Sequence, residues 1–136
     1  MQREEVTSKL SEFAFDFFFW FSRFEFALKE SGLLKSHRLG TAAEPGWAEF
    51  TRKHQSQYAL STSAKRLIEL SPQQQVVGLG DKLEWAQYKF PANATDLQRV
   101  VRLLKIVRNN LFHGGKHGGP FWDNPPRTEL LLVLCK

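Results

Sequence analysis

The sequence predicts an all-α fold of four to five helices, with a short irregular or hairpin insertion around residues 72–92. Apolar residues return every three or four positions in the first segment and again after Asp96, which is the spacing of one helical face. Between Pro72 and Pro91 this period fails, and glycines interrupt the chain. The length of 136 residues is that of one domain, so we expect a single domain over residues 1–136.

The first helix is predicted over roughly Glu4 to Ser31, and Gly32 is expected to end it. One apolar face contains Val6, Leu10, Phe13, Phe17, Phe21, Phe24 and Leu28. A second apolar row contains Phe15, Phe18, Phe19 and Phe26. A helix that is apolar on two sides needs two surfaces to cover it. Either this helix lies at the centre of its own bundle, or it packs on its own core and also on a second subunit.

The middle of the chain is predicted as a loop followed by two shorter helices. The loop covers Gly40 to Gly46, and the helices cover Trp47 to Tyr58 and Ser61 to Leu70. For Pro72 to Pro91, a short hairpin and an irregular excursion both fit the pattern.

The last long helix is predicted from Asp96 to His113. Thr95 and Gln98 have the spacing of a capping box, in which each side chain accepts a hydrogen bond from the other residue's backbone amide. Gly114 follows the helix as a stop signal. The final stretch, Thr128 to Lys136, is expected to be a short apolar helix or strand.

Composition narrows the classes of partner and location. The net charge of +5 and the pI near 9.6 favour a polyanionic partner. The only cysteine, Cys135, excludes an internal disulfide, and the scattered histidines predict no metal site and no cofactor. The first residues lack the order of a signal peptide, and Phe17 to Phe21 is too short to span a bilayer. We therefore expect a cytoplasmic protein with no membrane contact.

Arg108 is an anomaly on the last helix. On a helical wheel it falls inside the apolar arc, between Leu97 and Val101. A guanidinium keeps its charge, so burial demands a partner. One interpretation is structural: Arg108 extends to the rim or pairs with a buried acid such as Glu25. The other is functional: Arg108 points into a polar crevice that receives a phosphate or an acid.

The opposite face of this helix is basic, with Arg99, Arg102 and Lys105 continued by Asn109 and His113. Asn109 and His113 are four residues apart, so the amide could fix one tautomer of the imidazole. The structural alternatives are a solvated basic face and a histidine that only caps the helix C-terminus.

The stretch Arg-Asn-Asn-Leu-Phe-His at residues 108–113, followed by Gly-Gly-Lys, resembles the signature of HEPN domains. The segment Arg23-Phe24-Glu25 is similar to the first helix of several bacterial members. The resemblance implies an up-and-down helical bundle that forms a homodimer and brings two copies of the signature together. It also implies a metal-independent endoribonuclease of the toxin or antiviral-defence type, which a cognate antitoxin could accompany.

The roles that follow from this resemblance are specific. Arg108 would hold the scissile phosphate, and His113 would act as base or acid for 2′-hydroxyl attack. Asn109 and Glu25 would support them, Glu25 on resemblance only. The residues expected to bind RNA are Arg102, Lys105, Lys116 and His117, although an ordinary polar turn is the alternative for the last two.

Two other functions are compatible with the same residues. One is a non-catalytic HEPN module that binds RNA, a nucleotide or a protein partner. The other is a helical interaction protein whose working surface is the Phe-rich first helix.

Overall fold

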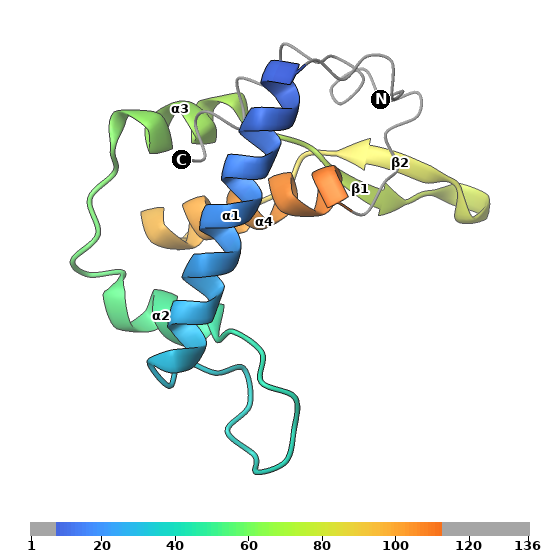
Figure 1. Cartoon of the computed structure of the whole chain (residues 1–136). Helices are drawn as coiled ribbons and strands as arrows, with labels where there is room; N and C mark the ends of the chain where they lie inside the picture. The colour runs from blue at the N-terminus through green and yellow to red at the C-terminus, as the bar shows by residue number, and fades with distance from the viewer. Residues whose placement is uncertain (1–7, 113–136) are drawn as a thin grey trace.

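A computed structural model describes residues 8–112 (Figure 1). Its elements in chain order are α1 (Ser8–Glu30), α2 (Trp47–His54), α3 (Thr62–Leu70), β1 (Gln74–Val77), a 3₁₀ turn (Leu79–Asp81), β2 (Leu83–Ala86) and α4 (Asp96–Phe112).

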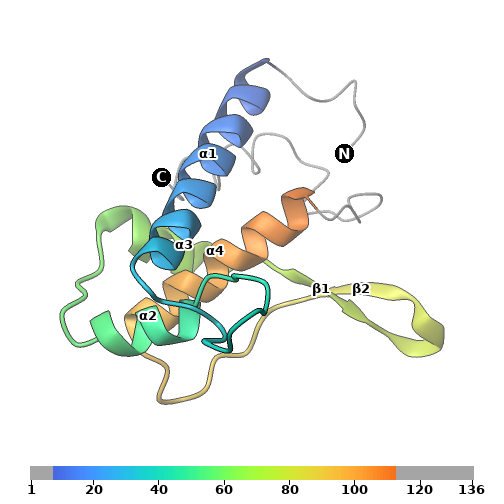
Figure 2. The same cartoon turned by 60° about the horizontal axis from the view of Figure 1, so that its bottom comes forward.

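The all-α class predicted from the sequence is wrong. The described residues form four α-helices and a two-stranded antiparallel sheet, so the fold is mixed α/β and not an up-and-down helical bundle. Strands β1 and β2 pair in the register Gln74↔Ala86 to Val77↔Leu83. Of the two alternatives for residues 72–92, the hairpin is the one that forms, and it projects away from the helices in both views (Figures 1 and 2).

The hairpin forms because its connection supplies the backbone angles that a tight turn needs. Gly80 and Asp81 both have positive φ angles, of 64° and 60°. Glycine adopts this region without steric cost, and aspartate is among the few other residues that tolerate it. Val76 and Val77 on β1 are β-branched residues, which fit extended strands.

Helix α1 lies across α4 (Figure 1), and two apolar clusters hold the pair together. The cluster at the start of α1 contains Leu10, Phe17, Leu67, Leu103, Ile106 and Val107. The cluster at its end contains Leu28, Leu33, Trp47, Leu97 and Val101. Phe21 is partly buried and packs against both clusters. Most of the predicted apolar face of the first helix therefore meets the core, whereas Phe24 is 40% exposed and Val6 lies outside the described residues.

Local signals read from the sequence define the helix starts. The Thr95 amide donates to Oε1 of Gln98 at 2.9 Å, and the Gln98 amide donates to the Thr95 hydroxyl oxygen at 3.2 Å, which confirms the capping box. The Ser61 hydroxyl oxygen accepts from the Ala64 amide at the start of α3. Helix α2 is shorter than predicted and ends at His54.

The second apolar row of α1 lies on the surface of the described part. Its exposed members are Phe15, Phe18, Phe19 and Phe26, and Trp20 is also exposed. The described residues therefore cover only one of the two apolar sides of this helix. Within residues 8–112, no helix combines the length and the hydropathy that crossing a membrane requires.

Candidate functional site

Four cations follow one another along α4 at intervals of three residues, and each lies over an aromatic ring. The rings come from three parts of the chain: α1, α2 and the segment between β2 and α4. The pairs, with the distance from the charged atom to the ring centroid, are Arg99 over Phe90 (5.9 Å), Arg102 over Tyr88 (4.4 Å), Lys105 over Trp47 (5.5 Å) and Arg108 over Phe21 (5.1 Å). Cation–π contacts of this kind restrict the rotamers of long side chains and hold the charges in place.

Arg108 is held by a short polar chain that begins at Trp47. The Trp47 indole Nε1–H donates to Oε2 of Glu25 at 2.7 Å, and the same oxygen lies 3.5 Å from Nη1 of Arg108. The side chains of Arg108 and Glu25 are only 30% and 22% exposed. The ion pair between Arg108 and Glu25 that the structural interpretation predicted is therefore present.

The other edge of the Arg108 guanidinium is bonded to its neighbour in the chain. Nε and Nη2 donate to Oδ1 of Asn109 at 3.1 and 2.9 Å. Asn109 thus orients Arg108. The arrangement presents a planar cation with fixed direction, which is the form that suits recognition of a phosphate oxygen pair.

A cleft of about 890 Å³ opens beside Arg108, between α4, the start of α2 and the loop before α2. Five basic side chains line it: Lys35, Arg52, Arg102, Lys105 and Arg108. Three carboxylates also line it, and each has a partner. Glu44 pairs with Lys35 at 3.4 Å, Glu49 pairs with His37 at 3.1 Å, and Glu25 has the contacts given above. Within residues 8–112, no carboxylate pairs with Arg102 or Lys105, so the floor of the cleft has surplus positive charge.

The electrostatics of Lys105 show the effect of this surplus. Burial lowers the pKa of Lys105 below its ordinary value, and the neighbouring guanidinium groups of Arg108 and Arg102 lower it further. Glu25 acts in the opposite direction but does not cancel these effects. An anion bound in the cleft would relieve the repulsion among the three cations.

A second, smaller cavity of about 290 Å³ continues the cleft on the side of β1. Arg102, Lys105 and Asn109 line both spaces. At its floor, Asn110 is only 4% exposed and donates from Nδ2 to the Gln73 carbonyl oxygen at 2.7 Å. This bond ties α4 to the start of the hairpin and gives the cavity a rigid wall.

The cleft brings together five residues that the sequence singled out: Glu25, Arg102, Lys105, Arg108 and Asn109. The other three, His113, Lys116 and His117, lie outside the described residues, and so does the predicted contact between Asn109 and His113. Sequence reasoning missed Trp47, Lys35 and Arg52 as parts of the cleft. No local signal could have found Trp47, because its partner Glu25 is 22 positions away in the chain.

No family model, no curated protein and no solved structure matched the chain. Among the described residues, no three or more His, Cys, Asp or Glu side chains gather in a way that could hold a metal ion.

Proposed function

We propose that the chain is a metal-independent endoribonuclease of HEPN type, acting as a toxin or an antiviral-defence effector in the cytoplasm. The observation that carries the proposal is the fixed guanidinium of Arg108 at the edge of a cleft with surplus positive charge. RNA offers the matching partner, because its backbone places a phosphate beside every 2′-hydroxyl.

The chemistry divides between the two ends of the signature. Arg108 binds two oxygens of the scissile phosphate and stabilises the charge that develops on them. His113, five positions further along the chain, removes the proton of the 2′-hydroxyl. The 2′-oxygen then forms a bond to phosphorus, the bond from phosphorus to the 5′-oxygen breaks, and that oxygen takes up a proton from the imidazolium that the first step formed. The products are a 2′,3′-cyclic phosphate and a free 5′-hydroxyl.

Arg102 and Lys105 bind the backbone next to the scissile phosphate. They are three residues apart on α4, so their positions rise about 4.5 Å along the helix, and both line the cleft that contains Arg108. Lys116 and His117 complete the RNA contact in this proposal. Because the contacts between these cations and the RNA phosphates are electrostatic, the affinity for RNA falls strongly as the salt concentration rises.

The active form in this proposal is a homodimer, with the site composed at the subunit boundary. Support comes from the exposed aromatic row of α1, which is a large apolar surface for a soluble monomer. A two-fold axis there would bring two copies of the signature near each other. A cognate antitoxin could silence the enzyme by filling the cationic cleft with acidic side chains.

The test is RNA digestion in the presence of EDTA. We expect the parent protein to cut RNA and leave cyclic phosphate ends, and we expect Arg108→Ala and His113→Ala to lose at least 100-fold in rate, which is the usual contribution of one acid–base or charge-stabilising group. Arg66→Ala is the matched control, because Arg66 is exposed on α3, where it pairs with the exposed Glu69, and it lies outside the cleft. If Arg108→Ala and His113→Ala cut as fast as the parent, the proposal is wrong.

A second candidate is a non-catalytic module that binds RNA, a nucleotide or an acidic protein partner. The cleft supports it independently, because the surplus charge of Arg102 and Lys105 attracts phosphate whether or not a reaction follows. RNA binding by the parent without any product in the same assay would favour this candidate over the ribonuclease.

A further inference from the structure

A pocket of about 320 Å³ adjoins the cationic cleft on the side of the segment between β2 and α4. Tyr88, Phe90 and Pro91 of that segment line the pocket. Arg102 and Lys105 line both the pocket and the cleft. A ligand whose anionic group is bound in the cleft can therefore extend into the pocket while it stays in contact with these two cations.

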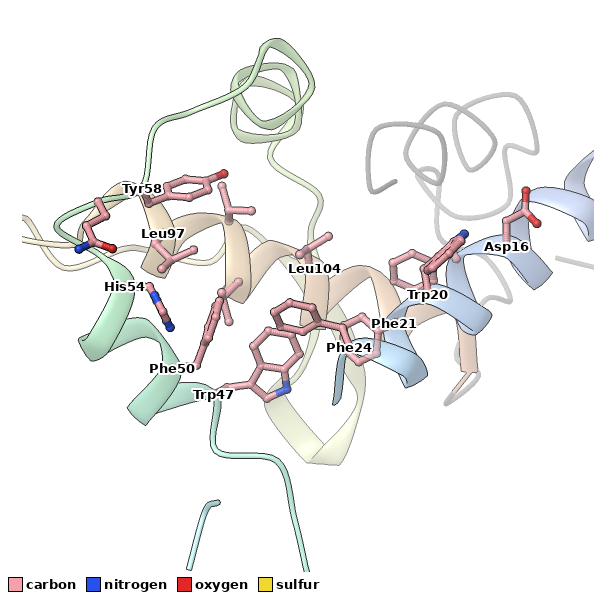
Figure 3. Close-up of a pocket in the computed structure, with 14 residues that line it drawn as sticks. Asp16, Trp20, Phe21, Phe24, Trp47, Phe50, His54, Tyr58, Leu97 and Leu104 are labelled. Carbon is pink, nitrogen blue, oxygen red and sulfur yellow. The ribbon is translucent and has the colours of Figure 1, made fainter. Parts of the chain in front are cut away.

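Other rings fix the aromatic walls of the pocket. The rings of Tyr88 and Phe90 meet edge to face, with their centroids 5.1 Å apart. Trp47 also lines the pocket, and on the side of the neighbouring apolar cavity its ring packs against Phe21 and Phe24, at 5.5 and 5.2 Å between centroids (Figure 3). Because these rings are already fixed, a flat ligand can bind without first ordering them.

Arg102 adds a second kind of flat surface to the pocket. Its guanidinium lies 4.4 Å from the centroid of the Tyr88 ring, and its Nη2 donates to Oε1 of Gln74 on β1 at 3.5 Å. A guanidinium spreads its charge over a plane, so it can bind a phosphate at its edge and a nucleobase on its face. Arg102 thus suits both parts of a nucleotide.

We propose that this pocket binds a base of single-stranded RNA, an inference that rests on the proposed binding of RNA in the cleft. Each nucleotide of RNA carries one anion and one planar ring, joined through a single ribose. The two adjoining spaces match this pair, because one has surplus positive charge and the other has aromatic walls. An acidic peptide would satisfy the cations of the cleft, but its carboxylates would leave the aromatic pocket without a matching group.

The bound base belongs to a nucleotide beside the scissile phosphate. Arg102 precedes Arg108 by six residues on α4, which corresponds to roughly 9 Å along the helix axis. Arg108 holds the scissile phosphate in the proposed function, so the phosphate on Arg102 and Lys105 is a neighbouring one, and its base enters the pocket. A base inside a duplex is paired and stacked and cannot enter. The preferred substrate is therefore a single strand or a loop.

Binding of uncleavable 2′-O-methyl RNA tests the base site without any reaction. The probes are a single strand of mixed sequence, the duplex of that strand with its complement, and an oligomer with as many phosphates as the strand but no bases. We expect the parent protein to bind the strand at least about 5-fold more tightly than the base-free oligomer, the lower limit for stacking of one base. The duplex should bind more weakly than the strand, although it carries twice as many phosphates.

Two variants assign the base preference to this pocket. Tyr88→Leu removes the ring but keeps apolar volume, and it should bring the affinities for the strand and the base-free oligomer close to equality. Tyr88→Phe is the matched control and should keep the preference. Ala94→Leu narrows the pocket without removing a ring or a cation and should also reduce the preference, whereas Ala59→Leu, at an exposed position outside both spaces, should not.

Three results would overturn the base site. They are equal binding of the strand and the base-free oligomer by the parent, tighter binding of the duplex than of the strand, and an unchanged preference in both Tyr88→Leu and Ala94→Leu. Failure to bind any of the probes would overturn both the base site and the proposed function. Base-dependent binding without cleavage in EDTA would overturn the ribonuclease alone, so the two failures are distinguishable.

Discussion

Trp47 reaches Arg108 through a single oxygen atom. Oε2 of Glu25 accepts the indole hydrogen bond at 2.7 Å and lies 3.5 Å from Nη1 of Arg108. Trp47 is buried in the cluster that joins the end of α1 to α4, so the position of the guanidinium depends on the packing of the core. This dependence leads to the first prediction.

Replacing Glu25 should separate its two roles. Glu25→Ala leaves the buried Trp47 N–H without an acceptor, and an unsatisfied buried group costs about 1–3 kcal/mol. Glu25→Gln keeps an amide oxygen for Trp47 while removing the charge opposite Arg108. Urea unfolding should therefore show a larger loss of stability for Glu25→Ala than for Glu25→Gln. Equal losses would mean that the indole bond contributes nothing.

Asn110 should be necessary for the junction between α4 and the hairpin. Asn110→Ala removes the hydrogen bond that the Asn110 side chain donates to the Gln73 carbonyl oxygen. We expect a loss of about 1–3 kcal/mol in the free energy of unfolding. Asn109→Ala on the exposed neighbouring position should cost no more than about 0.5 kcal/mol. Thermal unfolding of the two variants provides the comparison, and similar values for both would refute the assignment.

Lys105 should destabilise the free protein at neutral pH. Its pKa is lowered in the folded state, first by burial and then by Arg108 and Arg102. A lysine with a lowered folded pKa opposes folding while it is protonated, and this penalty disappears as the pH rises through the folded pKa toward the unfolded value. Lys105→Met should therefore raise the melting temperature at pH 7, and the gain should shrink as the pH approaches about 10.4.

The matched control for Lys105→Met is Lys65→Met on α3. Lys65 is exposed and does not line the cleft. This variant should show no comparable gain at pH 7. A Lys105→Met protein that is less stable than the parent at pH 7 would contradict the prediction.

Arg102 should contribute to polyanion affinity in a salt-dependent way. Arg102→Gln is expected to weaken binding of a 2′-O-methyl RNA, which lacks the nucleophile for cleavage, and to reduce the slope of log K against log salt by about 0.7. Fluorescence anisotropy between 50 and 200 mM salt measures both quantities. Arg66→Gln on α3 should leave the slope unchanged. If Arg102→Gln left the slope unchanged, Arg102 would not contact the RNA phosphates.

Local sequence signals predicted much of the secondary structure, because they act over a few residues. Thr95 and Gln98 defined the start of α4 from their spacing alone. The apolar period of α1 identified the face that meets the core. The hairpin was one of two alternatives for its region, because the short runs around Gly80 had no period long enough to decide.

The fold class and the cleft depended on contacts between distant residues, and local signals do not report those. The strong helical patterns of α1 and α4 led to an all-α class, while strand pairing between β1 and β2 makes the fold mixed. The sequence predicts Glu25 as a partner of Arg108, but it does not predict Trp47, which bonds to Glu25. The loop that adds Lys35 to the cleft had no distinguishing pattern in the sequence.

The rings beneath the α4 cations come from separate parts of the chain. Arg108 rests on Phe21 of α1, Lys105 on Trp47 of α2, and Arg102 on Tyr88 beyond the hairpin. In a chain whose first helix has not yet packed against α4, the Arg108 side chain lacks its contact with Phe21 and can adopt other rotamers. The full set of fixed charges therefore requires the folded chain, and a displacement of α1 would release Arg108 from Phe21 while Lys105 and Arg102 kept their rings.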